Sequence, residues 1–307
     1  MKIERLFLVM VMVIGILCCI SLFTSCDGNG GGGDDDDDGA SDDDGSGDDD
    51  TDDDDDSELD LWGGVSISEG YYSSNYQALH YYCGAGAAFY DPDDWNNGGY
   101  GEPDDEEGDC KLYHYSGNTQ TYETLSAGIV TLTGANVSPI HLNPVAYQYG
   151  YYYQADVDFL NVNNLFDEND TFNAHVAGGN GIGPLDISVD ALPMISITKP
   201  SDFDLLKSLP HSSMTFKWNK GGAEKVFLSL STYTTTKTSM TGVIIMCEAP
   251  DEQGEIDVSG DLMEHLQNNP TTISVMMSKE NYKESVGDRP ISFTAMTYRQ
   301  RSYVNVK

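Results

Sequence analysis

The 307-residue sequence is poor in basic residues. It has 15 lysines and arginines against 51 aspartates and glutamates, and its formal net charge is −36. Nucleic acids and anionic lipid surfaces attract proteins through clusters of lysine and arginine. The shortage of bases therefore argues against nucleic acid as a partner.

The sequence also lacks the short motifs of common enzymes. It has no G-x-S-x-G nucleophile elbow, no H-E-x-x-H zinc motif, no C-x-x-C pair and no P-loop. The glycines of residues 178–183 (GGNGIG) do not have dinucleotide-loop spacing and predict a hairpin turn instead. We therefore predict a protein that is not an enzyme; a hydrolase with a site dispersed over loops is an alternative.

Long apolar runs are missing after residue 23. The one such run, residues 6–23, follows Lys2 and Arg5 and ends at Thr24 and Ser25, directly before Cys26. A charged start, an apolar run and small residues are the layout of a secretory signal peptide. An uncleaved spanning helix is the alternative, because about 18 apolar residues are near the minimum for crossing a bilayer.

Residues 22–26 (LFTSC) resemble the lipobox of bacterial lipoproteins, with Phe23 where leucine is commonest. This resemblance implies that residues 1–25 are a signal peptide, that Cys26 receives a diacylglyceryl group, and that the lipid anchors the protein in the cell envelope. The acids behind Cys26 resemble signals for export to the outer membrane or cell surface. Asp27 resembles the opposite, inner-membrane retention rule, so the leaflet stays open.

Residues 26–60 are predicted to be a disordered acidic tether. Residues 27–60 hold 19 acids and no lysine or arginine, with glycine and serine between the aspartate blocks. Such a segment buries too little apolar surface to offset the entropy of ordering, and its like charges repel one another. It would hold the folded part away from the membrane.

The remaining residues predict an all-β protein with two β-sandwich-like domains, 61–193 and 194–307, divided near Pro193. In the second domain, seven segments have strand composition with turn residues between them: 194–198, 214–219, 225–231, 242–249, 255–258, 272–278 and 291–297. Residues 261–267 predict a short helix with Ser259 as N-cap.

The segment MTFKWN places Met214, Phe216 and Trp218 on one face of a strand. It resembles the core-tryptophan strand of fibronectin type III and immunoglobulin-like domains, which implies a sandwich for residues 194–307. The chain as a whole, with its lipobox, its tether and the segments LSAGIVTLTGA and HVAGGNGIG, resembles a group of Gram-negative lipoproteins; that resemblance implies no activity.

In the first domain, apolar residues alternate over 79–89, 127–132, 145–159 and 172–177. The odd-numbered tyrosines from Tyr147 to Tyr153 lie on the apolar face and are predicted to be core. Gly150 interrupts that pattern, which is therefore either one bent strand or a hairpin.

Three cysteines follow Cys26. In the oxidising compartment that export implies, Cys83 and Cys110 are predicted to form a disulfide. Cys247 lies in the apolar run VIIMC and is predicted to be a buried free thiol.

The loop of residues 91–109 holds nine acids and no base between Cys83 and Cys110. A solvated loop is the simpler interpretation. Calcium prefers several carboxylate and carbonyl ligands, so a calcium site is the functional alternative. Its ligands would come from Asp91, Asp93, Asp94, Asp104 and Asp105. A second acidic stretch, NVNNLFDEND at 161–170, offers Asp167, Asn169 and Asp170 and is also typical of a turn.

No cofactor is required by this sequence, and calcium is the one candidate. Trp95, Tyr100 and Tyr152 are the aromatic residues predicted to be exposed, and they are candidates for stacking on sugar rings. We predict a lipid-anchored protein with a non-enzymatic binding, adhesion or structural role. Its candidate partners are the membrane, a glycan and an envelope or extracellular protein; calcium-dependent carbohydrate binding is the alternative function.

Overall fold

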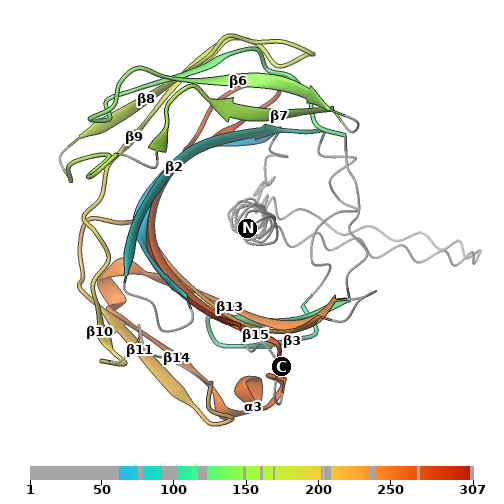
Figure 1. The fold of residues 1–307 in the computed structure, drawn as a ribbon, viewed down its shortest axis with the longest axis vertical. Helices are drawn as coiled ribbons and strands as arrows, with labels where there is room; N and C mark the ends of the chain where they lie inside the picture. The colour runs from blue at the N-terminus through green and yellow to red at the C-terminus, as the bar shows by residue number, and fades with distance from the viewer. Residues whose placement is uncertain are drawn as a thin grey trace, which may run out of the picture. The chain divides into compact units, whose positions relative to one another are not determined.

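The computed structural model describes residues 62–74, 79–91, 103–116, 123–147, 150–159, 162–168, 170–201, 203, 209–235, 240–267 and 270–304. These residues are almost entirely β-structure (Figure 1), so the predicted all-β class is confirmed. The predicted signal peptide, Cys26 and the tether lie outside the described residues.

The largest sheet has eight strands in the order β2-β1-β16-β15-β12-β13-β4-β3, and it is strongly curved (Figure 1). Its strands are β1 (Gly63–Ser74), β2 (His80–Phe89), β3 (Asp105–Glu107), β4 (Cys110–Ser116), β12 (Lys225–Thr235), β13 (Met240–Pro250), β15 (Thr272–Glu284) and β16 (Ser292–Val304). Two smaller sheets lie on the convex side of this sheet (Figure 1).

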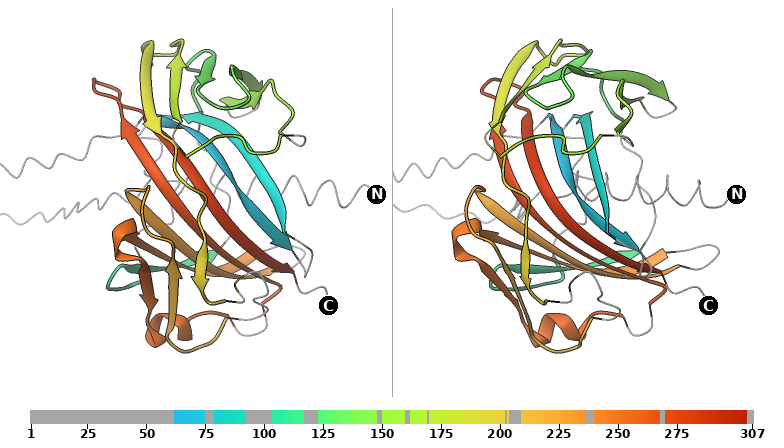
Figure 2. Two further views of the ribbon diagram at one scale, coloured as in Figure 1. Left: turned by 90° about the vertical axis from the view of Figure 1, so that its left-hand side faces the viewer. Right: turned by 60° about the vertical axis from the view of Figure 1, so that its left-hand side comes forward.

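The first described strand and the last one lie side by side in the large sheet. β1 and β16 pair in parallel, with Val65 opposite Phe293 and Ile67 opposite Ala295. Figure 2 shows the blue strand β1 next to the red strand β16. All four of these side chains are fully buried, because alternate residues of both strands face the convex side.

A five-stranded antiparallel sheet, in the order β7-β6-β5-β8-β9, covers one half of the large sheet. Its strands are β5 (Val130–Thr133), β6 (Ile140–Tyr147), β7 (Gly150–Ala155), β8 (Thr171–Val176) and β9 (Leu185–Asp190). Its inner side chains pack against β1, β2 and β16 to form a first hydrophobic core. Each fully buried side chain there, such as Leu142 or Phe172, contributes roughly 1.5 to 3 kcal/mol of transfer free energy.

A three-stranded sheet covers the other half and forms a second core. Its strands, in the order β10-β11-β14, are β10 (Ile197–Lys199), β11 (Met214–Trp218) and β14 (Glu255–Val258). Phe216 and Trp218 of β11 are buried in this core, as the MTFKWN pattern predicts. The helix α3 (Gly260–Glu264) follows, and its N-cap Ser259 accepts a hydrogen bond from the backbone N–H of Leu262 at 3.2 Å, also as predicted.

The boundary between the two cores falls near residue 193, but the large sheet contains strands from both sides of that boundary. The first core uses residues up to Leu192 together with the first half of β16, and the second uses residues from Ile195 onward together with β4. Residues 60–307 form one compact unit. The two predicted sandwich-like halves therefore share one sheet, because strands from each half complete the backbone pairing of the other.

The alternating pattern at 145–159 belongs to a hairpin of two strands, β6 and β7, and not to one bent strand. β6 and β7 pair antiparallel, with Tyr147 opposite Gly150. Gly150 has a φ of +117°, and a Cβ there would lie 2.1 Å from the carbonyl oxygen of Thr124, so only glycine fits. Because odd-numbered residues of β6 are paired with even-numbered residues of β7, the odd-numbered residues of the two strands lie on opposite faces of the sheet. Tyr153 therefore packs against the core, while Tyr147 is 44% exposed. The prediction that Tyr147 is core is wrong.

The disulfide joins Cys110 to Cys247, and the predicted Cys83–Cys110 pair is wrong. Cys110 of β4 and Cys247 of β13 are directly opposite in register, with their Cα atoms 4.0 Å apart. Cys83 lies on β2, which five other strands separate from β4. It is a buried free thiol, and burial raises its pKa to about 11, so it stays protonated at neutral pH.

Candidate functional site

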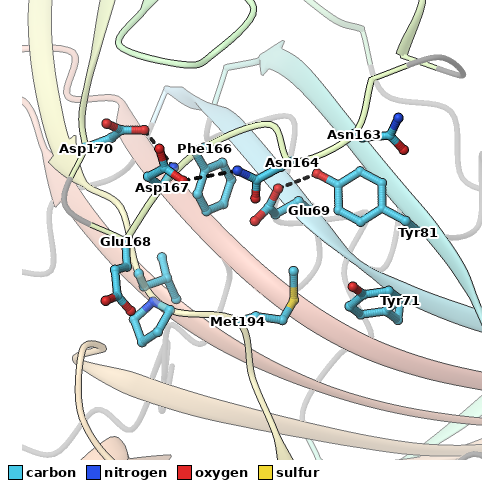
Figure 3. A pocket seen from close by; sticks show the side chains of 12 residues that line it. Glu69, Tyr71, Tyr81, Asn163, Asn164, Phe166, Asp167, Glu168, Asp170 and Met194 are labelled. Atoms are coloured by element: carbon cyan, nitrogen blue, oxygen red, sulfur yellow. Dashed lines mark hydrogen bonds between the residues drawn. The ribbon is translucent and has the colours of Figure 1, made fainter.

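A cleft of about 840 Å³ lies on the convex side of the large sheet, against β1 and β2 (Figure 3). The turn that precedes β8 and the linker that follows β9 complete its wall. Its lining residues are Glu69, Tyr71, Tyr81, Asn163, Asn164, Phe166, Asp167, Glu168, Asp170, Leu192, Pro193 and Met194. Side chains from segments about 100 residues apart in the chain thus meet at one place.

Glu69 fixes the turn to the sheet. Its side chain is almost fully buried, and its carboxylate accepts a hydrogen bond from the Tyr81 hydroxyl. The backbone N–H of Leu165 donates to Glu69 Oε2 at 2.8 Å and to the Tyr81 hydroxyl oxygen at 2.7 Å. Leu165 itself is fully buried in the first core. The cleft wall is therefore held by a polar anchor and an apolar one.

Burial changes the acidity of this anchor. It raises the pKa of the Glu69 carboxyl above its usual value, and the hydrogen bonds from Tyr81 and Leu165 oppose that rise. Burial and the adjacent Glu69 carboxylate also raise the pKa of Tyr81. Tyr81 therefore stays protonated and remains a hydrogen-bond donor.

The turn itself is held by its own side chains. Asn164 has a φ of +60°, a left-handed conformation that asparagine tolerates better than most residues. Its Nδ2 donates to Asp167 Oδ1 at 3.1 Å, and the backbone N–H of Asp167 donates to Asp170 Oδ2 at 2.7 Å (Figure 3). The predicted turn at 161–170 is thus present in its described part, and it brings Asp167 and Asp170 to the cleft.

The lining of the cleft is rich in hydrogen-bond acceptors. It includes four carboxyl groups, and none of its twelve side chains is basic. The rings of Tyr71 and Tyr81 meet edge to face, with centroids 5.9 Å apart. Such a surface favours ligands that carry hydroxyl or amino donors and an apolar or cationic face.

Only part of the predicted calcium loop is described. Asp104 lies beside β4: its Oδ2 accepts from the backbone N–H of His114 at 2.6 Å, which lowers its pKa. Asp105 begins β3 and is exposed, and Asp91 follows β2. Asp93, Asp94, Trp95 and Tyr100 lie outside the described residues. Within the described ranges no three His, Cys, Asp or Glu side chains form a metal-binding group, and the calcium prediction stays a prediction.

Tyr152 is 49% exposed on the outer face of the five-stranded sheet, away from the cleft. In the part of the chain that the structure describes, no helix has the length and apolar composition to cross a bilayer.

Sequence reasoning missed Glu69, Tyr71 and Tyr81. The alternation of Val65, Ile67 and Glu69 places this glutamate on the buried face of a strand, which is unusual for a carboxylate. That position was the available signal. The sequence contains no comparable signal for the contact between β1 and the turn before β8, because that contact depends on non-local packing.

Comparison with known proteins assigns no family: no protein-family model and no curated protein matches this sequence.

Proposed function

We propose that this chain is an exported protein, anchored to the envelope through a lipid on Cys26, whose folded part binds a ligand without converting it. The anchor rests on the signal-peptide and lipobox pattern of residues 1–26. The binding role rests on the cleft beside Glu69, which combines an open volume of about 840 Å³, two tyrosine rings and convergent polar side chains.

The acceptor-rich lining favours a ligand with several hydroxyl or amino donors, such as an amino sugar or a polyamine. Asp167, Glu168 and Asp170 attract a positive charge, and the tyrosine faces stabilise a cation or an apolar ring surface. The same carboxylates disfavour an anionic ligand.

A non-enzymatic role is supported by the state of Glu69. A hydrolase of the two-carboxylate type needs both groups directed at the substrate. The Glu69 carboxylate instead accepts hydrogen bonds from Tyr81 and Leu165, which hold it to the protein.

The proposal is tested by thermal unfolding of the full chain with glucosamine, spermidine or a neutral oligosaccharide. We expect the amines to raise the melting temperature by several degrees, since a ligand that binds only the folded state stabilises it. The paired substitution Asp167→Asn and Asp170→Asn should abolish the rise. Asp257→Asn, an exposed aspartate on β14, is the matched control and should leave the rise unchanged.

If no amine changes the melting temperature, the cleft has no ligand of this class and the proposal fails. A rise caused by millimolar calcium and reversed by chelator would instead support the calcium-dependent alternative. Products released from the oligosaccharide would support the hydrolase.

A further inference from the structure

Two tyrosines lie together on the outer face of the five-stranded sheet. Tyr147 of β6 and Tyr152 of β7 are 44% and 49% exposed, and their rings meet edge to face with centroids 6.0 Å apart. This face is the solvated side of the sheet: in strands β8 and β9 of the same sheet, exposed residues alternate with buried or partly buried ones.

Amide side chains follow the tyrosine pair along the same hairpin. Tyr152 is opposite Val145, and two residues further along, Asn143 is opposite Gln154. Two residues on the same face of a strand are about 6.7 Å apart. His141 comes next, with its ring Nδ1 3.2 Å from the hydroxyl of Thr131 on β5. One face of the hairpin thus presents aromatic rings, then amides, then an imidazole.

Tyr153, the neighbour of Tyr152 in β7, shows by contrast the environment of a tyrosine that packs against the core. Tyr153 faces the first core, and its hydroxyl oxygen accepts a hydrogen bond from the backbone N–H of Ala127 at 2.8 Å. Its ring packs edge to face on Phe89 at 5.3 Å. Tyr147 and Tyr152 are not members of the first core, and large apolar groups gathered on a solvated face are a feature of binding surfaces.

We propose that this surface of the β6–β7 hairpin, formed by Tyr147, Tyr152, Asn143, Gln154 and His141, binds a neutral polysaccharide chain. A sugar ring has an apolar C–H face, which packs on tyrosine rings, and an edge of hydroxyls, which amides serve as both donors and acceptors. The elongated order of these groups along the hairpin suits a chain of sugars better than a single one.

Charge selects a neutral polymer over an acidic one. β6 and β7 contain no lysine or arginine, and Asp156 lies at the far end of the hairpin, where its Oδ1 accepts from the backbone N–H of His141 at 2.8 Å. A uronic-acid polymer would meet only repulsion from Asp156 and the acidic chain. This inference is independent of the cleft beside Glu69.

The test is electrophoresis of the full chain through native gels that contain xylan, mixed-linkage β-glucan, galactomannan or starch, with polygalacturonate as the acidic comparison. We expect at least one neutral polymer, and not polygalacturonate, to retard the protein. The double variant Tyr147→Ala and Tyr152→Ala should weaken this binding about tenfold or more. Tyr82→Ala, which removes a tyrosine that is 37% exposed on the large sheet, should leave it unchanged.

No retardation by any neutral polymer, or retardation that the tyrosine double variant leaves intact, would overturn the inference. Binding lost on adding chelator would overturn it as well, because this surface uses no metal. Circular dichroism of the variants establishes that they fold. The paired substitution Asp167→Asn and Asp170→Asn should not alter retardation, so failure here and failure of the cleft proposal are separate results.

Discussion

Asp251 joins three parts of the second core through one buried carboxylate. Its Oδ1 accepts from Trp218 Nε1 at 2.8 Å, and its Oδ2 accepts from the backbone N–H of Ala223 at 3.2 Å. Lys279, equally buried, places its Nζ 3.2 Å from Asp251 Oδ1 and donates to the carbonyl oxygen of Gly221 at 2.8 Å. Removing one member of such a pair leaves an uncompensated charge in the protein interior.

We therefore expect Asp251→Ala to lower the free energy of unfolding by about 3 to 5 kcal/mol, measured by urea denaturation. Adding Lys279→Met to that variant should restore part of the loss, because the stranded charge is gone. The control is Lys217→Ala, which breaks the exposed ion pair with Glu255 and should cost less than about 1 kcal/mol. An Asp251→Ala loss as small as the control's would contradict the assignment.

The burial of Trp218 was predictable from its alternation with Phe216, whereas its partner was not. Asp251 is 33 residues away, in the 3₁₀ helix η3 (Asp251–Gln253), within a stretch typical of a solvated turn. The same holds for the cleft: residues 161–170 were predicted as an acidic turn, but nothing local indicates that Glu69 meets it. Composition predicts which side chains are polar and not which of them converge.

At the scale of elements, the disulfide ties β4 to β13. In the chain-entropy view, a cross-link stabilises by restricting the unfolded chain, and the two cysteines are separated by 137 residues. The bond therefore links a strand of the first half of the sequence to the second core.

We expect the double variant Cys110→Ala and Cys247→Ala to lose about 2 to 5 kcal/mol in guanidinium unfolding, with the reduced wild type behaving alike. Cys83→Ala, which removes only a buried thiol, should lose about 1 kcal/mol. Peptide mapping that found Cys83 in the disulfide would contradict this pairing.

Alternation predicted the existence of most strands well. All seven segments proposed for residues 194–307 form strands, from β10 to β16. Alternation does not specify which strands pair or where the chain turns. The prediction that Tyr147 faces the core was wrong for this reason: between β6 and β7 the odd-numbered residues change from the outer face of the sheet to the inner one. β1 was not predicted, since Gly63, Gly64 and Gly70 dilute its pattern.

At the scale of the whole molecule, two cores share one sheet. Residues 194–307 cannot complete it alone, because β13 would lose β4 and β16 would lose β1. Each loss exposes a long strand edge and uncovers buried side chains.

We accordingly expect residues 194–307, expressed alone, to show no cooperative thermal transition, and residues 61–193 to behave likewise. Residues 61–307 should unfold in one transition, monitored by circular dichroism and by tyrosine and tryptophan fluorescence. Two independent transitions, each reproduced by one isolated half, would show that the halves fold separately despite the shared sheet.

The parallel pairing of β1 with β16 determines when during biosynthesis the fold can close. β1 leaves the ribosome more than 200 residues before its partner, so one of its edges has no strand to pair with until β16 has been synthesised. Non-local pairing of this kind is slow and exposes an unpaired edge to aggregation. The large sheet and the first core around Val65 and Phe293 therefore cannot be completed until β16 has been synthesised.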